Sequence, residues 1–142
     1  FNLIKVEDVM FRDLDEERRV NGLVLNWSPV TRLGLHVDPL TVRSRFVVDG
    51  TGHDAEVCNI VARKIDARLD TRSGGVVGEM SMWAHRGEAW TIDNAGEIFP
   101  GLYVTGMAAN AARGGPRMGP VFGGMLLSGE KIAAEIAGIL RP

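Results

Sequence analysis

Short runs of β-branched and aromatic residues separated by polar stretches occupy the first third of the chain, and this pattern predicts β-strands. The runs cover residues 3–6, 9–11, 23–27 and 42–49. The charged stretch 12–19 lies between two of these runs and predicts a solvent-exposed turn. Residues 28–39 hold two prolines and show no sustained period, so we expect a loop or crossover there that carries His36.

Helical spacing begins after residue 54. Apolar residues at positions 57, 60, 61 and, a turn later, 65 recur as on one helix face, which predicts a helix over 55–64. The polar, glycine-containing segment 66–87 shows little periodicity and predicts no element. The remaining predicted elements are a turn at 97–101, a buried strand at 102–105, a glycine-rich loop at 106–119 and a long helix at 121–140 laid against a sheet. Together these elements predict an α/β fold.

Length and charge narrow the class of protein. The 142 residues suit one globular domain, and 16 basic against 18 acidic side chains give a net charge of -2, which offers no basic face for nucleic acid. No apolar run reaches the roughly 18 residues that a membrane span needs. The single cysteine, Cys58, excludes an intrachain disulfide. We therefore expect a soluble, cytoplasmic protein with no nucleic-acid or membrane partner.

The stretch Gly50-Thr51-Gly52-His53-Asp54-Ala55 follows a strand and opens a helix. A G-x-G-x-x-A pattern in this context is typical of a loop that binds dinucleotide phosphates at a helix N-terminus. The acidic residue expected about 20 positions further on is missing. A plain structural turn is the second interpretation, and a turn that presents His53 is the third.

His53 is a candidate ligand of a metal ion. Asp38 lies upstream in a loop that also holds His36, and an imidazole with a carboxylate suits iron, manganese or zinc. Two such side chains in loops are more often solvated or capping groups, and Asp54 is itself a candidate N-cap for the helix that follows. Spacing alone leaves these alternatives open.

The glycine-rich loop at 106–119 suggests an anion site. Six of the 18 glycines lie within 106–124, which indicates that the backbone approaches another group closely. Arg117 stands between Pro116 and Pro120 and could hold a carboxylate or phosphate with its bidentate fork. A surface arginine on a flexible loop is the alternative.

Other residues that could carry chemistry are assigned structural or surface roles. Cys58 falls on the apolar face of the predicted helix, so we expect a buried, inert thiol. We expect His85 to be a surface histidine. We expect the three tryptophans, Trp27, Trp83 and Trp90, to be packing residues.

Three separated stretches resemble one family. GLHVDPLT (34–41), VVDGTGHDAEV (47–57) and GLYVTGMAANAARGGPRMGPVFGGMLLSG (101–129) are similar to the thiamine thiazole synthases, most closely to the archaeal, sulfide-dependent adenosine diphosphate thiazole synthases. The resemblance implies the C-terminal part of a Rossmann-like, glutathione-reductase-like dinucleotide-binding fold, with mixed sheets and a long C-terminal helix. Residues 1–142 would then form a single domain, a fragment without the N-terminal βαβ dinucleotide-binding unit.

The resemblance also implies a reaction and its site. NAD, as co-substrate, loses nicotinamide, its ADP-ribose part condenses with glycine, and sulfide supplies sulfur to give the adenylated thiazole precursor of thiamine. The family pattern assigns Fe(II) to Asp38 and His53 and the glycine carboxylate to Arg117. The contacts to the NAD-derived ligand and nucleotide match Val6, His36, Val37, Asp38 and Met107.

His36 occupies the position at which eukaryotic members carry a sulfur-donating cysteine, which implies a catalytic position in an enzyme that takes free sulfide. Members form ring-like homo-oligomers, here expected as an octameric ring, with sites near subunit contacts. Asp38 and His53 of one chain therefore need not meet. Two other functions stay open on the residues alone: the C-terminal part of an FAD-dependent oxidoreductase, and a non-catalytic remnant that binds nucleotide or oligomerises.

Overall fold

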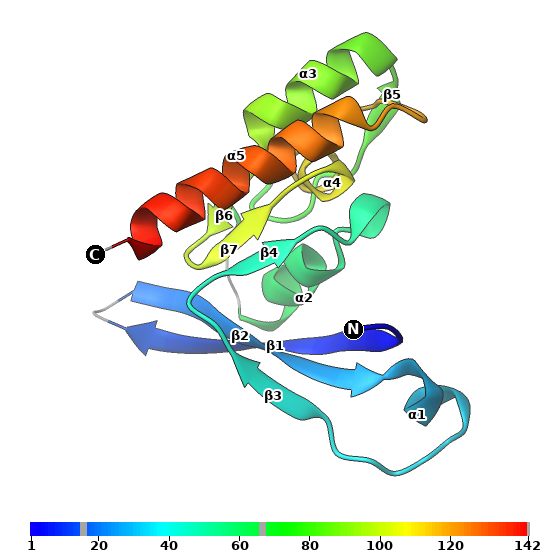
Figure 1. Ribbon diagram of the computed structural model, residues 1–142, viewed down its shortest axis with the longest axis vertical. Helices are drawn as coiled ribbons and strands as arrows, with labels where there is room; N and C mark the ends of the chain where they lie inside the picture. Colours follow the sequence, from blue (N-terminus) through cyan, green and yellow to red (C-terminus); the bar gives the residue numbers. More distant parts are fainter. Residues whose placement is uncertain (15–16, 66–67, 142) are drawn as a thin grey trace.

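The computed structural model describes residues 1–14, 17–65 and 68–141. A three-stranded antiparallel sheet forms the lower lobe in Figure 1, and a mixed sheet with its helices forms the upper lobe. The elements in chain order are β1 (Ile4–Leu14), β2 (Glu17–Trp27), α1 (Ser28–Arg32), β3 (Leu40–Arg43), β4 (Val47–Asp49), the short 3-10 helix η1 (Gly52–Asp54), α2 (Glu56–Lys64), β5 (Met80–Met82), α3 (Ala84–Asn94), β6 (Gly96–Phe99), β7 (Leu102–Val104), α4 (Met107–Arg113), β8 (Pro116–Arg117) and α5 (Gly123–Leu140).

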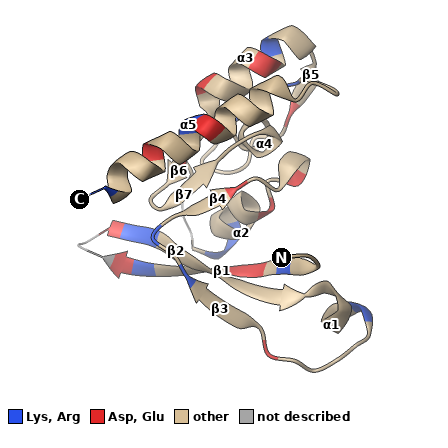
Figure 2. Cartoon of the chain, in the orientation of Figure 1, with Lys and Arg blue, Asp and Glu red and all other residues tan. Residues whose placement is uncertain are grey.

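β1 and β2 form one long antiparallel hairpin. The register runs from Ile4 opposite Trp27 to Leu14 opposite Glu17. The turn predicted at 12–19 is therefore wrong for residues 12–14 and 17–19, which belong to the two strands. Residues 15 and 16, where the prediction also fell, lie outside the described residues. Charged residues are frequent in the strands at this end of the hairpin (Figure 2). They are compatible with strand structure because they pair across it, as in the ion pair of Asp13 with Arg18.

The predicted strand at 42–49 is two strands in different sheets. β3 pairs antiparallel with β2, whereas β4 pairs parallel with β7. Residues 44–46 carry the chain from one sheet to the other. In β4, Val47 and Asp49 are buried and Val48 is exposed, which is the alternation of a strand with one covered face.

The core lies between the two sheets. α2 buries Val57, Cys58, Ile60 and Val61 between β1 and β4, as the helical spacing predicted (Figure 1). β7 is fully buried at the centre of the second sheet, in the order β4-β7-β6. α5 packs against α3 and confirms the predicted long C-terminal helix. The fold class predicted from the sequence is therefore confirmed, and none of the described helices is long and apolar enough to cross a membrane.

Several elements were not predicted: α1, η1, β5 and β8 are five residues long or shorter, and the longer α3 and α4 bury mostly small or polar residues. α3 buries only Gly87 and Thr91, so its sequence has no apolar stripe. α4 is buried at six of its seven positions, but most of these are alanines between Gly106 and Gly114, which made the segment look like a loop. The turn predicted at 97–101 contains most of β6, and only residues 100 and 101 turn.

The glycines after α4 allow close contact with aromatic and apolar side chains. A Cβ on Gly115 would lie 2.3 Å from the indole of Trp90, and a Cβ on Gly114 would lie 2.6 Å from Val77. The close backbone approach inferred from the glycine excess is therefore internal packing. Trp90 is a packing residue, as predicted, whereas Trp27 and Trp83 are exposed, which contradicts the prediction for these two.

We expect Gly115→Ala to lower the stability of the protein by about 1 to 3 kcal/mol, since the added methyl group overlaps the Trp90 ring. Gly75→Ala is the matched control, because no heavy atom lies within 4 Å of the position of its Cβ. Thermal unfolding of the two variants checks this, and equal melting temperatures would contradict the packing described.

Candidate functional site

The turn after β4 is organised by a buried carboxylate. Asp49 has no exposed surface, and its Oδ1 accepts hydrogen bonds from the Thr51 amide at 2.9 Å and the Thr51 hydroxyl at 2.7 Å. Its Oδ2 accepts from the Cys58 amide at 2.9 Å. The Glu56 amide in turn donates to Thr51 Oγ1 at 2.7 Å. The first amides of α2 are thus satisfied by side chains of the turn itself.

This arrangement decides between the interpretations of residues 50–55. The N-terminus of a helix attracts an anion, and here the Asp49 carboxylate already fills that position. A pyrophosphate would compete with a buried charge, so the phosphate-loop interpretation fails. The prediction that Asp54 caps α2 is also wrong, because Ala55 is the N-cap and Asp49 and Thr51 supply the bonds.

His53 and Arg117 converge on one acidic side chain, Glu79. His53 Nδ1 lies 2.7 Å from Glu79 Oε1 and 2.8 Å from Oε2. Arg117 Nε lies 3.2 Å from Glu79 Oε2. The side chain of Glu79 is 11% exposed, against 55% for His53 and 50% for Arg117. The structure therefore brings together two of the predicted site residues through a third residue that was not predicted.

The position of Glu79 is set by backbone hydrogen bonds on both sides of it. The amides of Val77 and Gly78 donate to the carbonyls of Ala112 and Ala111 at 3.0 and 2.8 Å. The Met80 amide donates to the Gly115 carbonyl at 2.9 Å. These bonds tie the segment to α4 and to the loop that carries Arg117.

Asn110 fixes that loop from inside the core. Its side chain is fully buried, and Nδ2 donates to the Pro116 carbonyl at 2.7 Å. The Thr91 hydroxyl lies 2.7 Å from Asn110 Oδ1, and the amides of Gly114 and Gly115 donate to the Asn110 carbonyl. An asparagine inside a run of alanines is a signal that could have pointed to this role.

Parallel pairing places η1 and α4 at one edge of the second sheet, because they follow the carboxyl ends of β4 and β7. Ligands of open α/β sheets bind at such edges. The two segments contact each other, and Met107 is buried at the start of α4. Val6 is half-buried in β1 of the other sheet.

His36, Val37 and Asp38 lie elsewhere, in the loop between α1 and β3. Residues 31–45 are exposed throughout, and the Asn26 side chain donates to the Val37 carbonyl at 3.4 Å. In Figure 1 this loop extends at the lower end of the molecule, away from the turn between β4 and α2. One chain does not bring Asp38 to His53. In the described ranges, no three His, Cys, Asp or Glu side chains are grouped to hold a metal.

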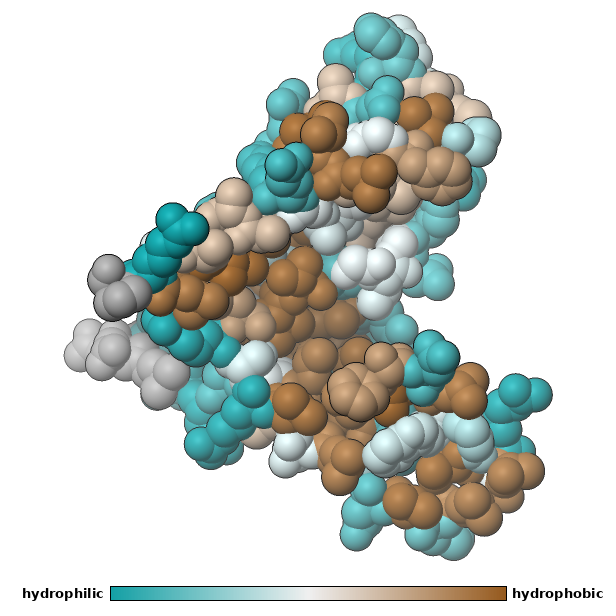
Figure 3. Space-filling model, in the orientation of Figure 1, coloured by the Kyte–Doolittle hydropathy of each residue, from teal (hydrophilic) through white to brown (hydrophobic). Residues whose placement is uncertain are grey.

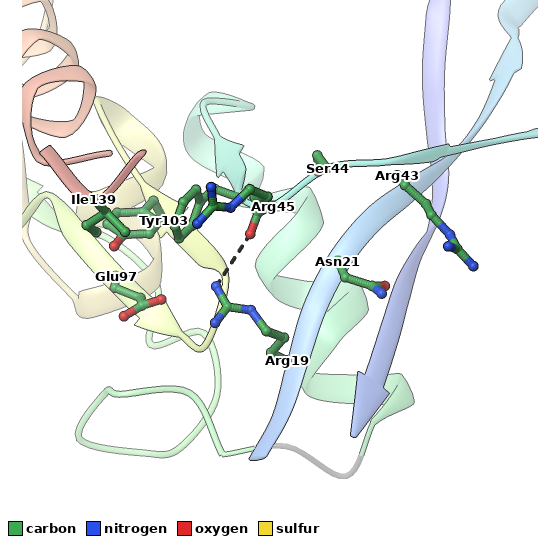
Figure 4. A pocket seen from close by; sticks show the side chains of 9 residues that line it. Arg19, Asn21, Arg43, Ser44, Arg45, Glu97, Tyr103 and Ile139 are labelled. Atoms are coloured by element: carbon green, nitrogen blue, oxygen red, sulfur yellow. Dashed lines mark hydrogen bonds between the residues drawn. The ribbon is translucent and has the colours of Figure 1, made fainter. Parts of the chain in front are cut away.

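A sizeable cavity formed by the described residues lies away from this edge. It has a volume of about 720 Å³ and lies between the lobes, where Arg19, Arg43 and Arg45 line it with Tyr103 and Glu97 (Figure 4). Arg19 donates to the Arg45 carbonyl at 3.4 Å. None of the predicted site residues lines it.

The remaining predictions concern single residues. Cys58 is fully buried, and burial, together with the nearby Asp49 carboxylate, raises the pKa of its thiol. Its assignment as an inert core residue is therefore confirmed. His85 is exposed, as expected for a surface histidine.

Comparisons with known proteins agree on one family. The model of the Thi4 family matches residues 1–122. A relative named thiamine thiazole synthase from Desulfosudis oleivorans is 60% identical over 136 residues, covering 96% of this chain and 51% of the relative. A protein of the same name from the archaeon Methanothermobacter thermautotrophicus is 57% identical over 136 residues, with the same shares covered.

A solved structure matches as well. The crystal structure of Thermovibrio ammonificans THI4 superposes with a TM-score of 0.95 at 52% identity, and the match covers 99% of this chain and 53% of that chain. The chain thus spans about half the length of the curated relatives it matches.

We expect Asp49→Asn to destabilise the protein by about 2 to 3 kcal/mol, because an amide group would turn a donor toward the Thr51 or Cys58 amide. The urea midpoint of unfolding measures the loss. Asp54→Asn, an exposed change in the same turn, is the control and should leave the midpoint unchanged. Equal midpoints for the two variants would contradict the role given to Asp49.

Proposed function

Because the chain belongs to the Thi4 family, we propose that its protein takes part in thiamine thiazole biosynthesis and forms adenosine diphosphate thiazole from NAD, glycine and sulfide with Fe(II). Family membership agrees with the resemblance found in the sequence motifs. The single observation that carries the proposal is the convergence of His53 and Arg117 on Glu79 at the carboxyl edge of β4 and β7.

The donor set at His53 fits a metal ligand. Ligating histidines commonly direct their second ring nitrogen to a carboxylate, and His53 directs Nδ1 to Glu79, which leaves Nε2 for Fe(II). Asp38 would supply a carboxylate oxygen, which is also a suitable donor for this metal. When bound, Fe(II) would bring sulfide and substrate into one coordination sphere, where carbon and sulfur can react.

Arg117 binds the glycine carboxylate in this proposal. Its Nε faces Glu79, and its two terminal nitrogens are the pair that can hold a carboxylate with two parallel hydrogen bonds. His36 has no sulfur to donate, so the sulfur comes from free sulfide. Val6, Val37 and Met107 contact the NAD-derived nucleotide in the same proposal.

The loop with Asp38 supports assembly of the site between copies. Residues 31–45 are exposed, and five large apolar side chains lie within this segment: Leu33, Leu35, Val37, Leu40 and Val42. Apolar surface also appears over the lower lobe in Figure 3. Such surface is typical of protein interfaces. We therefore propose a homo-oligomer, an octameric ring, in which Asp38 of one copy joins His53 of another.

We expect the intact protein to form the adenylated thiazole when incubated anaerobically with Fe(II), NAD, glycine and sulfide, as detected by mass spectrometry. His53→Ala should reduce the rate by about 100-fold or more, since a metal ligand is lost. His85→Ala is the control, because His85 is exposed outside the site. Absence of product, or equal rates for the two variants, would refute the proposal, and a bound flavin would favour the oxidoreductase instead.

Mixing two inactive variants tests assembly between copies. We expect Asp38→Ala and His53→Ala to lose activity separately, and their co-assembled mixture to regain about a quarter of the wild-type sites, since a site with both residues intact forms by chance between copies. If Asp38 and His53 acted from one chain, the mixture would stay inactive. A mixture of His53→Ala with His53→Gln is the control that should not recover.

A further inference from the structure

Glu79 is a nearly buried carboxylate that contacts two exposed groups of the candidate site. Its side chain is 11% exposed and lies between His53 on η1 and Arg117 on β8. No pattern in the sequence marks it, because it stands in the segment 66–87 that has no period. In the proposed function His53 binds the metal and Arg117 binds the glycine carboxylate. Neither role explains why both side chains contact the same carboxylate, that of Glu79.

We propose that Glu79 is a positioning residue that fixes the ring of His53 and the guanidinium of Arg117 relative to each other. The inference rests on the proposed function, since it takes the roles of His53 and Arg117 from it. Glu79 acts through these two side chains and has no contact of its own with metal or substrate in this proposal. The Glu79 carboxylate then sets the distance between His53, which binds the metal, and Arg117, which binds the glycine carboxylate.

The contact with His53 determines which ring nitrogen is available. Both oxygens of Glu79 lie within 2.8 Å of Nδ1, so a proton on Nδ1 is stabilised and the lone pair stays on Nε2. A ring held in this way cannot turn to present Nδ1 instead. Without Glu79, the half-exposed side chain could adopt either ring orientation and either tautomer.

The contact with Arg117 determines the direction of the guanidinium. Glu79 Oε2 lies 3.2 Å from Nε, on the flank of the planar group. Because the group is planar, a partner at Nε orients the edge that carries the two terminal nitrogens. That edge is the part that binds a carboxylate bidentately.

The backbone around Glu79 is rigid enough for this role. The neighbouring amides of Gly78 and Met80 are bonded to Ala111 and Gly115, so α4 and the Arg117 loop hold the segment from two sides. Two other glutamates bond to the backbone: the half-buried Glu88 accepts a hydrogen bond from the Gly124 amide, and the exposed Glu97 accepts one from the Gly101 amide. Glu79 contacts two side chains of the candidate site instead.

Three variants of the intact protein separate the two contacts. Glu79→Gln keeps an acceptor for Nδ1 but removes the charge that faces Arg117, whereas Glu79→Ala removes both. Glu130→Gln is the control, because Glu130 is exposed on α5. Metal binding is measured with Co(II) by its visible absorption, glycine use by KM and kcat, and folding by the melting temperature.

We expect Glu79→Ala to weaken Co(II) binding by about 10- to 100-fold and to raise the KM for glycine by about tenfold, with a smaller change in kcat. Glu79→Gln should raise the KM to a similar extent but weaken Co(II) binding less. Glu130→Gln should match the wild type. Co(II) binding and glycine KM within twofold of wild type in Glu79→Ala would overturn the proposal.

Three further outcomes are informative. If Glu79→Ala abolishes Co(II) binding as His53→Ala does, Glu79 is itself a metal ligand and the positioning role is wrong. If the wild type forms no thiazole, the proposed function fails, while Co(II) affinity still tests the contact with His53. Should Glu79→Ala not fold, Glu79→Gln retains the shape of the side chain, and an unchanged glycine KM in that variant would overturn the role at Arg117.

Discussion

Parallel pairing of β4 with β7 brings the segments after both strands to one edge of the second sheet, and the candidate site depends on this. The Thr105 amide donates to the Asp49 carbonyl at 3.1 Å, so the pairing continues to the last residue of β4. η1 with His53 follows one strand, and α4 with the loop to Arg117 follows the other. Residues far apart in the chain therefore meet because two short strands run in the same direction.

Asp49 explains why the turn after β4 resembles a phosphate loop without being one. A strand, glycines and a helix start are the shared geometry, and in both cases an anion satisfies the first helix amides. Here the anion is a buried side chain bonded to Thr51 and Cys58. With the N-terminus of α2 occupied, the turn can hold η1 in place, and His53 is one of the exposed side chains on η1.

The sequence predicts those parts whose signal is local. The apolar residues of α2 and α5 recur with helical spacing, so both helices could be predicted. His53 and Arg117 lie in specific motifs. α3 and α4 were missed because they bury glycine, threonine and alanine, which give no apolar stripe. Glu79 could not be found, because the partners that give it a role come from η1 and β8, and only the tertiary structure joins them.

Exposure of the site residues links binding to assembly in the proposed function. His53 and Arg117 are each about half exposed in one chain, and charged contacts that face water contribute little. A metal or carboxylate would be held more strongly once another surface excludes water from this edge. The apolar loop that carries Asp38 would bring that surface and a ligand together. The same contact would then complete the coordination of the metal and strengthen the hold of Arg117 on its carboxylate, so neither group needs to be buried within a single chain.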